Sequence, residues 1–291
     1  MHVLVTDKNS SIRGFILSEI TQMLSFNDTS IQDHESRIHE YRKALKRCRS
    51  LLRLIRYCMS AFSYERINGL LSNASKEIEE QRDSTVLLQT YLNLMKVHED
   101  RLSPWVKDTV KDYLEMRLSN AYVNIETKIL NNYESLFSRY LKTAYCELYT
   151  LKSDPCDASD VQTVIEKSYY TAANLYLNSK KTLDTQVIHK WRKSCKHLLL
   201  QLKFAPDNDA GSYHQLINTL DHIIYMLGID HDLAMLGYVI QNLIPILKDD
   251  IQRMLLIIFK ERAKLQKLIF RTGEDLFSED QVRNFRFVSC Y

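Results

Sequence analysis

A regular helical pattern runs through Ile38-His39-Glu40-Tyr41-Arg42-Lys43-Ala44-Leu45-Lys46-Arg47-Cys48-Arg49 and continues to Leu52-Arg53. Its apolar residues fall at positions 38, 41, 45, 48, 52 and 55, which is the spacing of a narrow seam along one helix face. Basic residues follow one position later, at 39, 42, 46, 49, 53 and 56. Because one residue is about 100° of helix rotation, the pattern predicts a helix with a buried stripe and a cationic stripe beside it.

The pattern returns without a gap, 150 residues later, in Ile188-His189-Lys190-Trp191-Arg192-Lys193-Ser194-Cys195-Lys196-His197-Leu198-Leu199. The basic positions match in pairs: His39 with His189, Arg42 with Arg192, Lys43 with Lys193, Lys46 with Lys196, and Arg53 with Lys203. The copies are unequal because Leu199 stands where the first copy has Arg49. We therefore expect the N-terminal helix to contribute more of any anion binding.

A second element repeats in the same order. Arg82-Asp83-Ser84-Thr85-Val86-Leu87 parallels His231-Asp232-Leu233-Ala234-Met235-Leu236, and each aspartate follows its leading histidine by 44 and 43 residues respectively. Two matched elements at nearly equal separation indicate duplicated halves. We predict a single domain over residues 1–291, with an N-terminal half over about 1–152 and a C-terminal half over about 159–291.

The remaining sequence favours helices throughout. Glycine and proline are scarce, at 6 and 4 of 291 residues, and no segment of useful length alternates with period two. The predicted fold class is therefore all-α. Helical spacing covers residues 10–25, 31–61, 62–100 with breaks near Asn73 and Arg82, 104–130, a segment to about 151, 159–179, 182–204, 212–227, 231–247 and 249–271.

The bulk charge says little about partners, because the net charge is only +3. None of the six cysteines forms a CxxC pair, so we expect small buried or incidental thiols in a reducing compartment. Charged residues Asp7 and Lys8 interrupt the start of the chain before a signal-peptide core could form, and Met254–Phe259 is too short to span a bilayer. We expect a cytoplasmic location and no membrane partner.

At the two histidine helices the sequence resembles the CHAD domain, the conserved histidine α-helical domain. Both copies fit H-x-x-R-[KR]-x-x-[KR]-x-x-[RKL], and Leu227-Gly228-Ile229-Asp230-His231-Asp232 fits the LG-x-x-x-D element that follows it. The first copy has Ile78-Glu79 in place of Leu-Gly but keeps Arg82-Asp83. The resemblance covers about residues 10–280.

This resemblance implies two pseudo-symmetric four-helix bundles around a basic central channel that binds inorganic polyphosphate. The implied contacts are His39, Arg42, Lys43, Lys46, Arg49, Arg53, His189, Arg192, Lys193, Lys196 and Lys203. A non-catalytic role in localisation or scaffolding is expected, with association with polyphosphate granules. Point-charge lysines and forked arginines both suit phosphate oxygens, which fits this ligand.

Several residues keep two interpretations. His39 and His189 would either contact phosphate or be buried hydrogen-bonding groups that position the helices. Asp83 and Asp232 would orient arginines or histidines, or cap helices, in preference to acting as catalytic acids. No firm metal pattern is found, because His34 and His39 are one residue too far apart for HExxH. We predict no metal and no cofactor.

Three rival functions remain open at this level. The same stripes could bind nucleic acid, or meet only acidic faces of other proteins. An enzyme acting on phosphate chains is disfavoured, because the chain has neither an ExExK motif nor a strand-rich segment, and lacks a Gly-rich phosphate loop. The leading prediction is a non-enzymatic polyphosphate-binding module.

Overall fold

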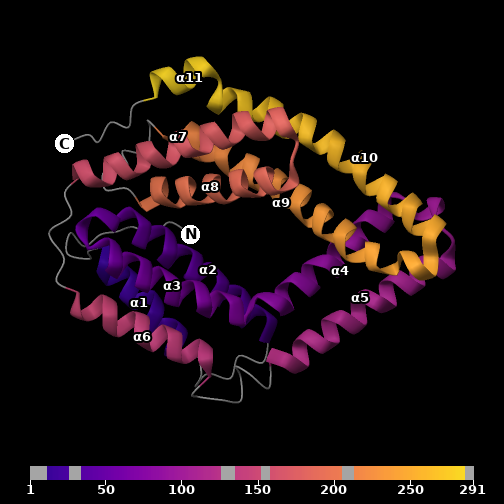
Figure 1. Ribbon diagram of the computed structural model, residues 1–291, viewed down its shortest axis with the longest axis horizontal. Coiled ribbons are helices and arrows are strands. Elements are labelled where there is room, and N and C mark those ends of the chain that lie inside the picture. Colours follow the sequence, from indigo (N-terminus) through magenta and orange to yellow (C-terminus); the bar gives the residue numbers. More distant parts are fainter. Residues whose placement is uncertain (1–11, 26–33, 126–134, 152–157, 205–212, 286–291) are drawn as a thin grey trace. The chain divides into compact units, whose positions relative to one another are not determined.

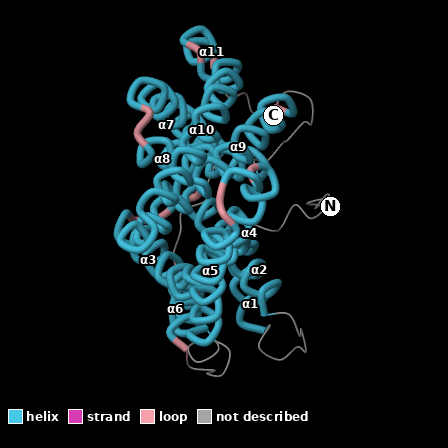
Figure 2. The backbone as a smooth tube through the Cα atoms, turned by 90° about the vertical axis from the view of Figure 1, so that its right-hand side faces the viewer, coloured by secondary structure: helices cyan, strands magenta, loops and turns pink. Residues whose placement is uncertain are grey.

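The computed structural model describes residues 12–25, 34–125, 135–151, 158–204 and 213–285, and within this part it contains helices and no strands (Figures 1 and 2). The all-α prediction is confirmed. The α-helices are α1 (Ile12–Ser25), α2 (His34–Leu54), α3 (Ala61–Glu77), α4 (Glu79–Val97), α5 (Pro104–Ile125), α6 (Leu136–Thr150), α7 (Ala158–Thr182), α8 (Thr185–Phe204), α9 (His214–Ile240), α10 (Ile244–Phe277) and α11 (Glu279–Asn284). Short 3-10 turns, Arg56–Cys58, Glu99–Arg101 and Gln241–Leu243, follow α2, α4 and α9.

The chain forms two compact units. The first comprises residues 1–82, 121–164 and 204–206, and the second comprises 83–120, 165–203 and 207–291. Residues 83–120, which the sequence assigned to the N-terminal half, thus pack within the second unit. The pseudo-symmetry of two halves and the central channel stay predictions.

The first unit is built from four helices in which each packs against two others. The helix pairs in contact are α1 with α2, α2 with α3, α3 with α6, and α6 with α1 (Figure 1). The apolar seam of each helix faces inward, and Ile16, Leu45, Leu71 and Leu141 are fully or almost fully buried. Serine caps begin two of these helices: the Ser60 and Ser135 side chains accept hydrogen bonds from backbone N–H groups in the first turns of α3 and α6.

The second unit has an aromatic core and an aliphatic core. Trp191 on α8 stacks on Phe270 of α10 with ring centroids 5.9 Å apart, and Tyr176 of α7 packs 5.3 Å from Trp191. The hydroxyl of Tyr176 donates to the Phe270 carbonyl oxygen at 3.1 Å, so the buried ring keeps a polar partner. The aliphatic core joins α4, α5, α9 and α10, and includes Leu87, Val110, Leu236 and Met254.

Two predicted helix boundaries are wrong. We expected a break between residues 227 and 231, but α9 runs without interruption through Gly228 because Leu227 and Leu233 keep one buried face continuous across it. We also expected breaks near Asn73 and Arg82. Both residues are helical, and the chain breaks instead at Ile78, whose φ of −112° and ψ of 12° separate α3 from α4.

The cysteines are only partly as expected. Cys48 and Cys195 are buried free thiols, and burial raises the pKa of both well above the usual value. Cys58, however, is disulfide-bonded, so the expectation of thiols throughout is wrong at this position. A disulfide depends on the spatial approach of two Cβ atoms, which spacing along the chain does not reveal.

One helical stretch, His214–Leu243, is long and apolar enough by length and composition to cross a membrane. Of its most apolar window, 56% is buried inside the structure, and a core helix of a folded domain passes the same test. This stretch is therefore weak support for a membrane span. The expectations of a cytoplasmic location and of no membrane partner stay predictions.

Candidate functional site

The predicted apolar seams of α2 and α8 are confirmed. On α2 and at the residue that follows it, the seam residues Ile38, Tyr41, Leu45, Cys48, Leu52 and Ile55 are all at most 7% exposed. On α8 the corresponding residues Ile188, Trp191, Cys195, Leu198 and Leu202 are at most 3% exposed. Each helix is thereby anchored in its own unit, which fixes the direction in which its basic residues project.

The matched arginines of the repeat lie at matched places in the two units. Arg42 is 8% exposed and donates from Nη1 to the carbonyl oxygen of Ile78 at 3.4 Å. Arg192 packs against Gly228, where an added Cβ would lie 3.4 Å from its Nη2. In the sequence alignment of the copies, Ile78 corresponds to Leu227, the residue before Gly228. Each arginine therefore connects its basic helix to the chain segment that leads to the aspartate element.

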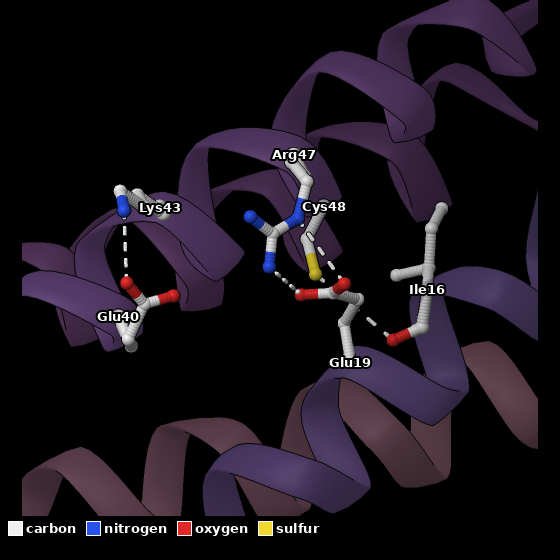
Figure 3. A network of polar contacts seen from close by, with 6 residues as sticks. All are labelled: Ile16, Glu19, Glu40, Lys43, Arg47 and Cys48. Atoms are coloured by element: carbon white, nitrogen blue, oxygen red, sulfur yellow. Dashed lines mark hydrogen bonds and ion pairs between the residues drawn. The ribbon is translucent and has the colours of Figure 1, made fainter. Parts of the chain in front are cut away.

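Several predicted contact residues are partly neutralised within the protein. Lys43 pairs with Glu40 at 2.8 Å, and this hydrogen bond lowers the pKa of Glu40 (Figure 3). Lys203 of α8 pairs with Asp221 of α9, also at 2.8 Å. Both pairs are exposed, so they contribute little to stability and leave the lysines able to exchange partners.

A residue that the prediction omitted fixes α2 to its neighbour. Arg47 forms a two-bond ion pair with Glu19 of α1, with Nη2–Oε2 and Nε–Oε1 distances of 2.6 Å and 3.1 Å (Figure 3). The Sγ of Cys48 lies 4.0 Å from the Ile16 carbonyl oxygen in the same contact (Figure 3). Paired arginine and carboxylate groups hold a defined geometry, so Arg47 positions the stripe and does not belong to it.

The end of α2 and the 3-10 turn after it carry three arginines, Arg49, Arg53 and Arg56, which we call the arginine cluster. Arg49 donates from Nε to Oδ1 of Asn68 on α3 at 3.1 Å. Burial, and then the nearby charge of Arg53, lower the pKa of Arg49 from its usual value, although an arginine stays charged. Among the described residues, no carboxylate forms an ion pair with any of the three.

On α8 the repeat histidine makes a side-chain pair. Nδ1 of His189 lies 3.1 Å from Nδ1 of His231 on α9, with ring centroids 4.3 Å apart. Burial, followed by the charges of Lys193, Arg192 and Lys196, lowers the pKa of His189 to about 4. This geometry favours the positioning interpretation for His189. His39 on α2 is exposed, and Lys46 and Lys193 are exposed as well.

The two predicted orienting aspartates, Asp83 and Asp232, are half-buried on α4 and α9. A third aspartate, Asp230 on α9, was not singled out from the sequence and forms a buried ion pair. Asp230 is 1% exposed and accepts from Nε and Nη2 of Arg262 at 3.0 Å and 3.2 Å. Gln266 donates to the same carboxylate at 2.9 Å. The signal was present, because Asp230 lies three residues from both Leu227 and Leu233 on the apolar face of α9.

The chemistry that these residues can perform is anion binding. The arginines and lysines of α2 and α8 carry N–H donors of the kind that bind phosphate oxygens. Within the part of the chain that the structure describes, no group of three or more His, Cys, Asp or Glu residues could hold a metal ion. The described residues thus offer no candidate metal centre, and the absence of a metal stays a prediction.

Comparison with known proteins agrees with this fold. The model of the CHAD domain family matches residues 16–241, and the chain belongs to that family. A solved structure described as PptA from Streptomyces chartreusis superposes with a TM-score of 0.66 at 12% sequence identity, covering 91% of this chain and 98% of that one. At that identity the likeness shows a shared fold. No curated protein matches the sequence.

Proposed function

We propose that this protein binds inorganic polyphosphate through the basic residues of α2 and α8 and does so without catalysis. The single observation that carries the proposal is the arginine cluster, in which three guanidinium groups at and just after the end of α2 lack a carboxylate partner among the described residues. Like charges held close together are unfavourable without a counter-charge, and a polyanion supplies one. Membership of the CHAD family supports the same ligand class.

The arrangement also suits a chain better than a single ion. Basic residues recur about once per helical turn along α2, from His39 through Arg42, Lys46, Arg49 and Arg53. Successive turns are about 5.4 Å apart, so several phosphates of one flexible chain can be engaged together. Because such binding releases counterions, its affinity is expected to fall steeply as salt is raised.

The roles of the individual residues differ. We assign direct phosphate contact to Lys46, Arg49, Arg53, Lys193 and Lys196, and contact after exchange of a surface carboxylate to Lys43 and Lys203. We assign a positioning role to the buried Arg42 and to His189, whose contacts lie within the protein. The proposal includes a cytoplasmic location at polyphosphate granules, where this ligand would be found.

Nucleic acid is the main competing ligand, and competition distinguishes it. Fluorescent polyphosphate is bound to the protein and displaced with unlabelled polyphosphate, duplex DNA or single-stranded RNA at equal phosphate concentration. The proposal predicts that polyphosphate displaces the label at least about tenfold more effectively than either nucleic acid. Equal displacement by DNA or RNA would contradict a polyphosphate-specific site.

Catalysis is tested separately. The protein is incubated with polyphosphate and Mg²⁺ or Mn²⁺, and free phosphate is measured over time. We expect no release above the rate of a protein-free control. Sustained release that disappears in a His39→Ala variant, with folding unchanged by circular dichroism, would overturn the non-enzymatic assignment.

A further inference from the structure

The arginine cluster extends past the repeated motif, because Arg56 lies in the 3-10 turn after α2. Its guanidinium carbon is 5.4 Å from the ring centroid of Tyr57 and 5.2 Å from that of Tyr64 on α3. Cation–π contacts of this kind hold a guanidinium in place and leave its N–H groups able to donate. Arg56 is exposed and Tyr57 is 46% exposed, so the group is accessible from solvent.

Two of the three arginines, Arg49 and Arg56, contact the same neighbouring helix, α3. Asn68 of α3 accepts from Nε of Arg49, while Tyr64, one turn earlier on α3, interacts with both Arg49 and Arg56. Arg49 and Arg53 are close enough for the charge of one to lower the pKa of the other. The neutral side chains of Asn68 and Tyr64 therefore hold Arg49 and Arg56 in place without neutralising their charge.

The second copy of the repeat does not reproduce this cluster. At the offset of 150 residues, Leu199 replaces Arg49, Lys203 replaces Arg53 and Pro206 replaces Arg56. Lys203 is moreover paired with Asp221. Both α2 and α8 carry a basic stripe, but only α2 is followed by the arginine cluster. Binding of the interior of a uniform polyanion therefore does not require the cluster.

The charge of the cluster matches a particular part of a phosphate chain. An internal phosphate carries one negative charge, whereas a terminal phosphate loses a second proton with a pKa of about 6 and offers three non-bridging oxygens. Three neighbouring guanidinium groups fit a doubly charged end group with three acceptor oxygens better than a singly charged internal unit.

We propose that Arg49, Arg53 and Arg56, of which Arg49 and Arg56 are held by Asn68 and Tyr64, form a subsite for the dianionic terminal phosphate of a linear phosphate chain. This inference rests on the proposed function and deepens it, because it gives the bound chain a defined end. The chain would begin at the arginine cluster and run along α2 towards Lys46 and Lys43.

The test compares linear tripolyphosphate with cyclic trimetaphosphate, which has the same number of phosphates but no terminal group. Affinities are measured by calorimetry at pH 7.5 for the wild type, Arg56→Gln and Arg139→Gln. Arg139 is an exposed arginine on α6 of the same unit and serves as the charge-matched control. The decisive quantity is the ratio of the two affinities within each protein, because charge alone favours the linear ligand.

We expect the wild type and Arg139→Gln to share one ratio in favour of the linear ligand, and Arg56→Gln to lower that ratio by at least about threefold. Tyr64→Leu, which removes the ring beneath Arg56, should lower the ratio in the same direction, and Tyr64→Phe should keep it. An unchanged ratio in Arg56→Gln, or no linear preference in the wild type, would overturn the subsite.

A parallel titration with long-chain polyphosphate separates the two proposals. If the long chain binds the wild type and the linear-to-cyclic ratio is the same in all variants, the end-group subsite is wrong and the proposed function stands. If the long chain fails to bind the wild type at all, the proposed function fails and the subsite fails with it.

Discussion

The guanidinium of Arg192 packs against the backbone of α9 at Gly228: a Cβ at that position would lie 3.4 Å from Nη2 and 3.8 Å from Nε. In the other unit, Arg42 donates to the carbonyl oxygen of Ile78. The arginine of each basic motif thus contacts the chain segment that precedes the aspartate element. This contact gives a structural reason for the two motifs to occur together in each copy.

The packing of Arg192 on Gly228 predicts that position 228 tolerates a small side chain but not a large one. A methyl group at 3.4 Å is in ordinary van der Waals contact, so Gly228→Ala should keep Arg192 in place. It should also raise the free energy of unfolding by up to about 1 kcal/mol, because alanine is the better helix former. Gly228→Leu should displace Arg192 and weaken polyphosphate binding. Thermal denaturation and polyphosphate titration of both variants check this, and loss of binding in Gly228→Ala would contradict the account.

Replacement of Gly273 by alanine should have the opposite effect on stability to Gly228→Ala. A Cβ on Gly273 would lie 2.6 Å from Cε2 of Tyr176 and 3.3 Å from Trp191, both buried in the aromatic core. Gly273→Ala should therefore destabilise the protein by roughly 1–3 kcal/mol through overpacking. Gly69 on α3 has no atom within 4 Å of an added Cβ and is the control. Chemical denaturation should show Gly69→Ala at or above wild-type stability, and equal losses in both variants would refute the packing argument.

The buried Asp230–Arg262 pair predicts a large loss of stability. Asp230→Ala would leave the guanidinium of Arg262, which is 18% exposed, without its carboxylate, at a cost of about 3–5 kcal/mol. Asp221→Ala on the same helix removes only an exposed pair with Lys203 and should cost less than about 1 kcal/mol. Urea unfolding of the two variants gives the comparison. Similar midpoints would show that Asp230 does not hold α9 to α10.

The pKa of His189 predicts how stability depends on pH. Its pKa is about 4 in the folded protein and near 6.5 in the unfolded chain. Between these values the unfolded chain binds the extra proton, so stability falls as pH is lowered from 6.5 towards 4. Because the ring is only partly buried, we expect this contribution to be about 1 kcal/mol.

The variant His189→Gln isolates that contribution. Melting temperatures measured from pH 7.5 to pH 4.5 should decline less steeply in His189→Gln than in the wild type. His214→Gln, which removes an exposed histidine of α9, should follow the wild-type profile. Parallel profiles for His189→Gln and the wild type would contradict a half-buried, neutral imidazole at position 189.

The sequence was sufficient for the fold class and for both buried seams, because helical periodicity depends on local spacing. Residues such as Leu45 and Trp191 are buried where the pattern placed them. Helix boundaries were harder to predict from the sequence. The break expected between residues 227 and 231 contains Gly228, and glycine is a poor helix former, yet the packing of Arg192 and Leu227 keeps α9 continuous there.

The candidate site was predicted as a set of basic residues, but the sequence could not say which of them have partners. Lys43 and Glu40 are neighbours on one helix, so their pairing could have been read from the spacing. Arg47 with Glu19 and Asp230 with Arg262 join residues that only the tertiary structure brings together. The arrangement of Tyr64 and Asn68 around the arginine cluster is likewise a product of the packing of α2 on α3.

The most direct test of polyphosphate binding by the basic helices is the salt dependence of the affinity. The wild type is compared with a triple variant, Arg49→Gln/Arg53→Gln/Lys193→Gln, and with a control triple variant of exposed cations outside α2 and α8, Lys76→Gln/Lys111→Gln/Arg139→Gln. If each cation displaces one counterion from a flexible chain, the slope of log affinity against log salt should become shallower by about 2 in the first variant. The control should keep the wild-type slope. Equal slopes in all three proteins would contradict binding through these helices.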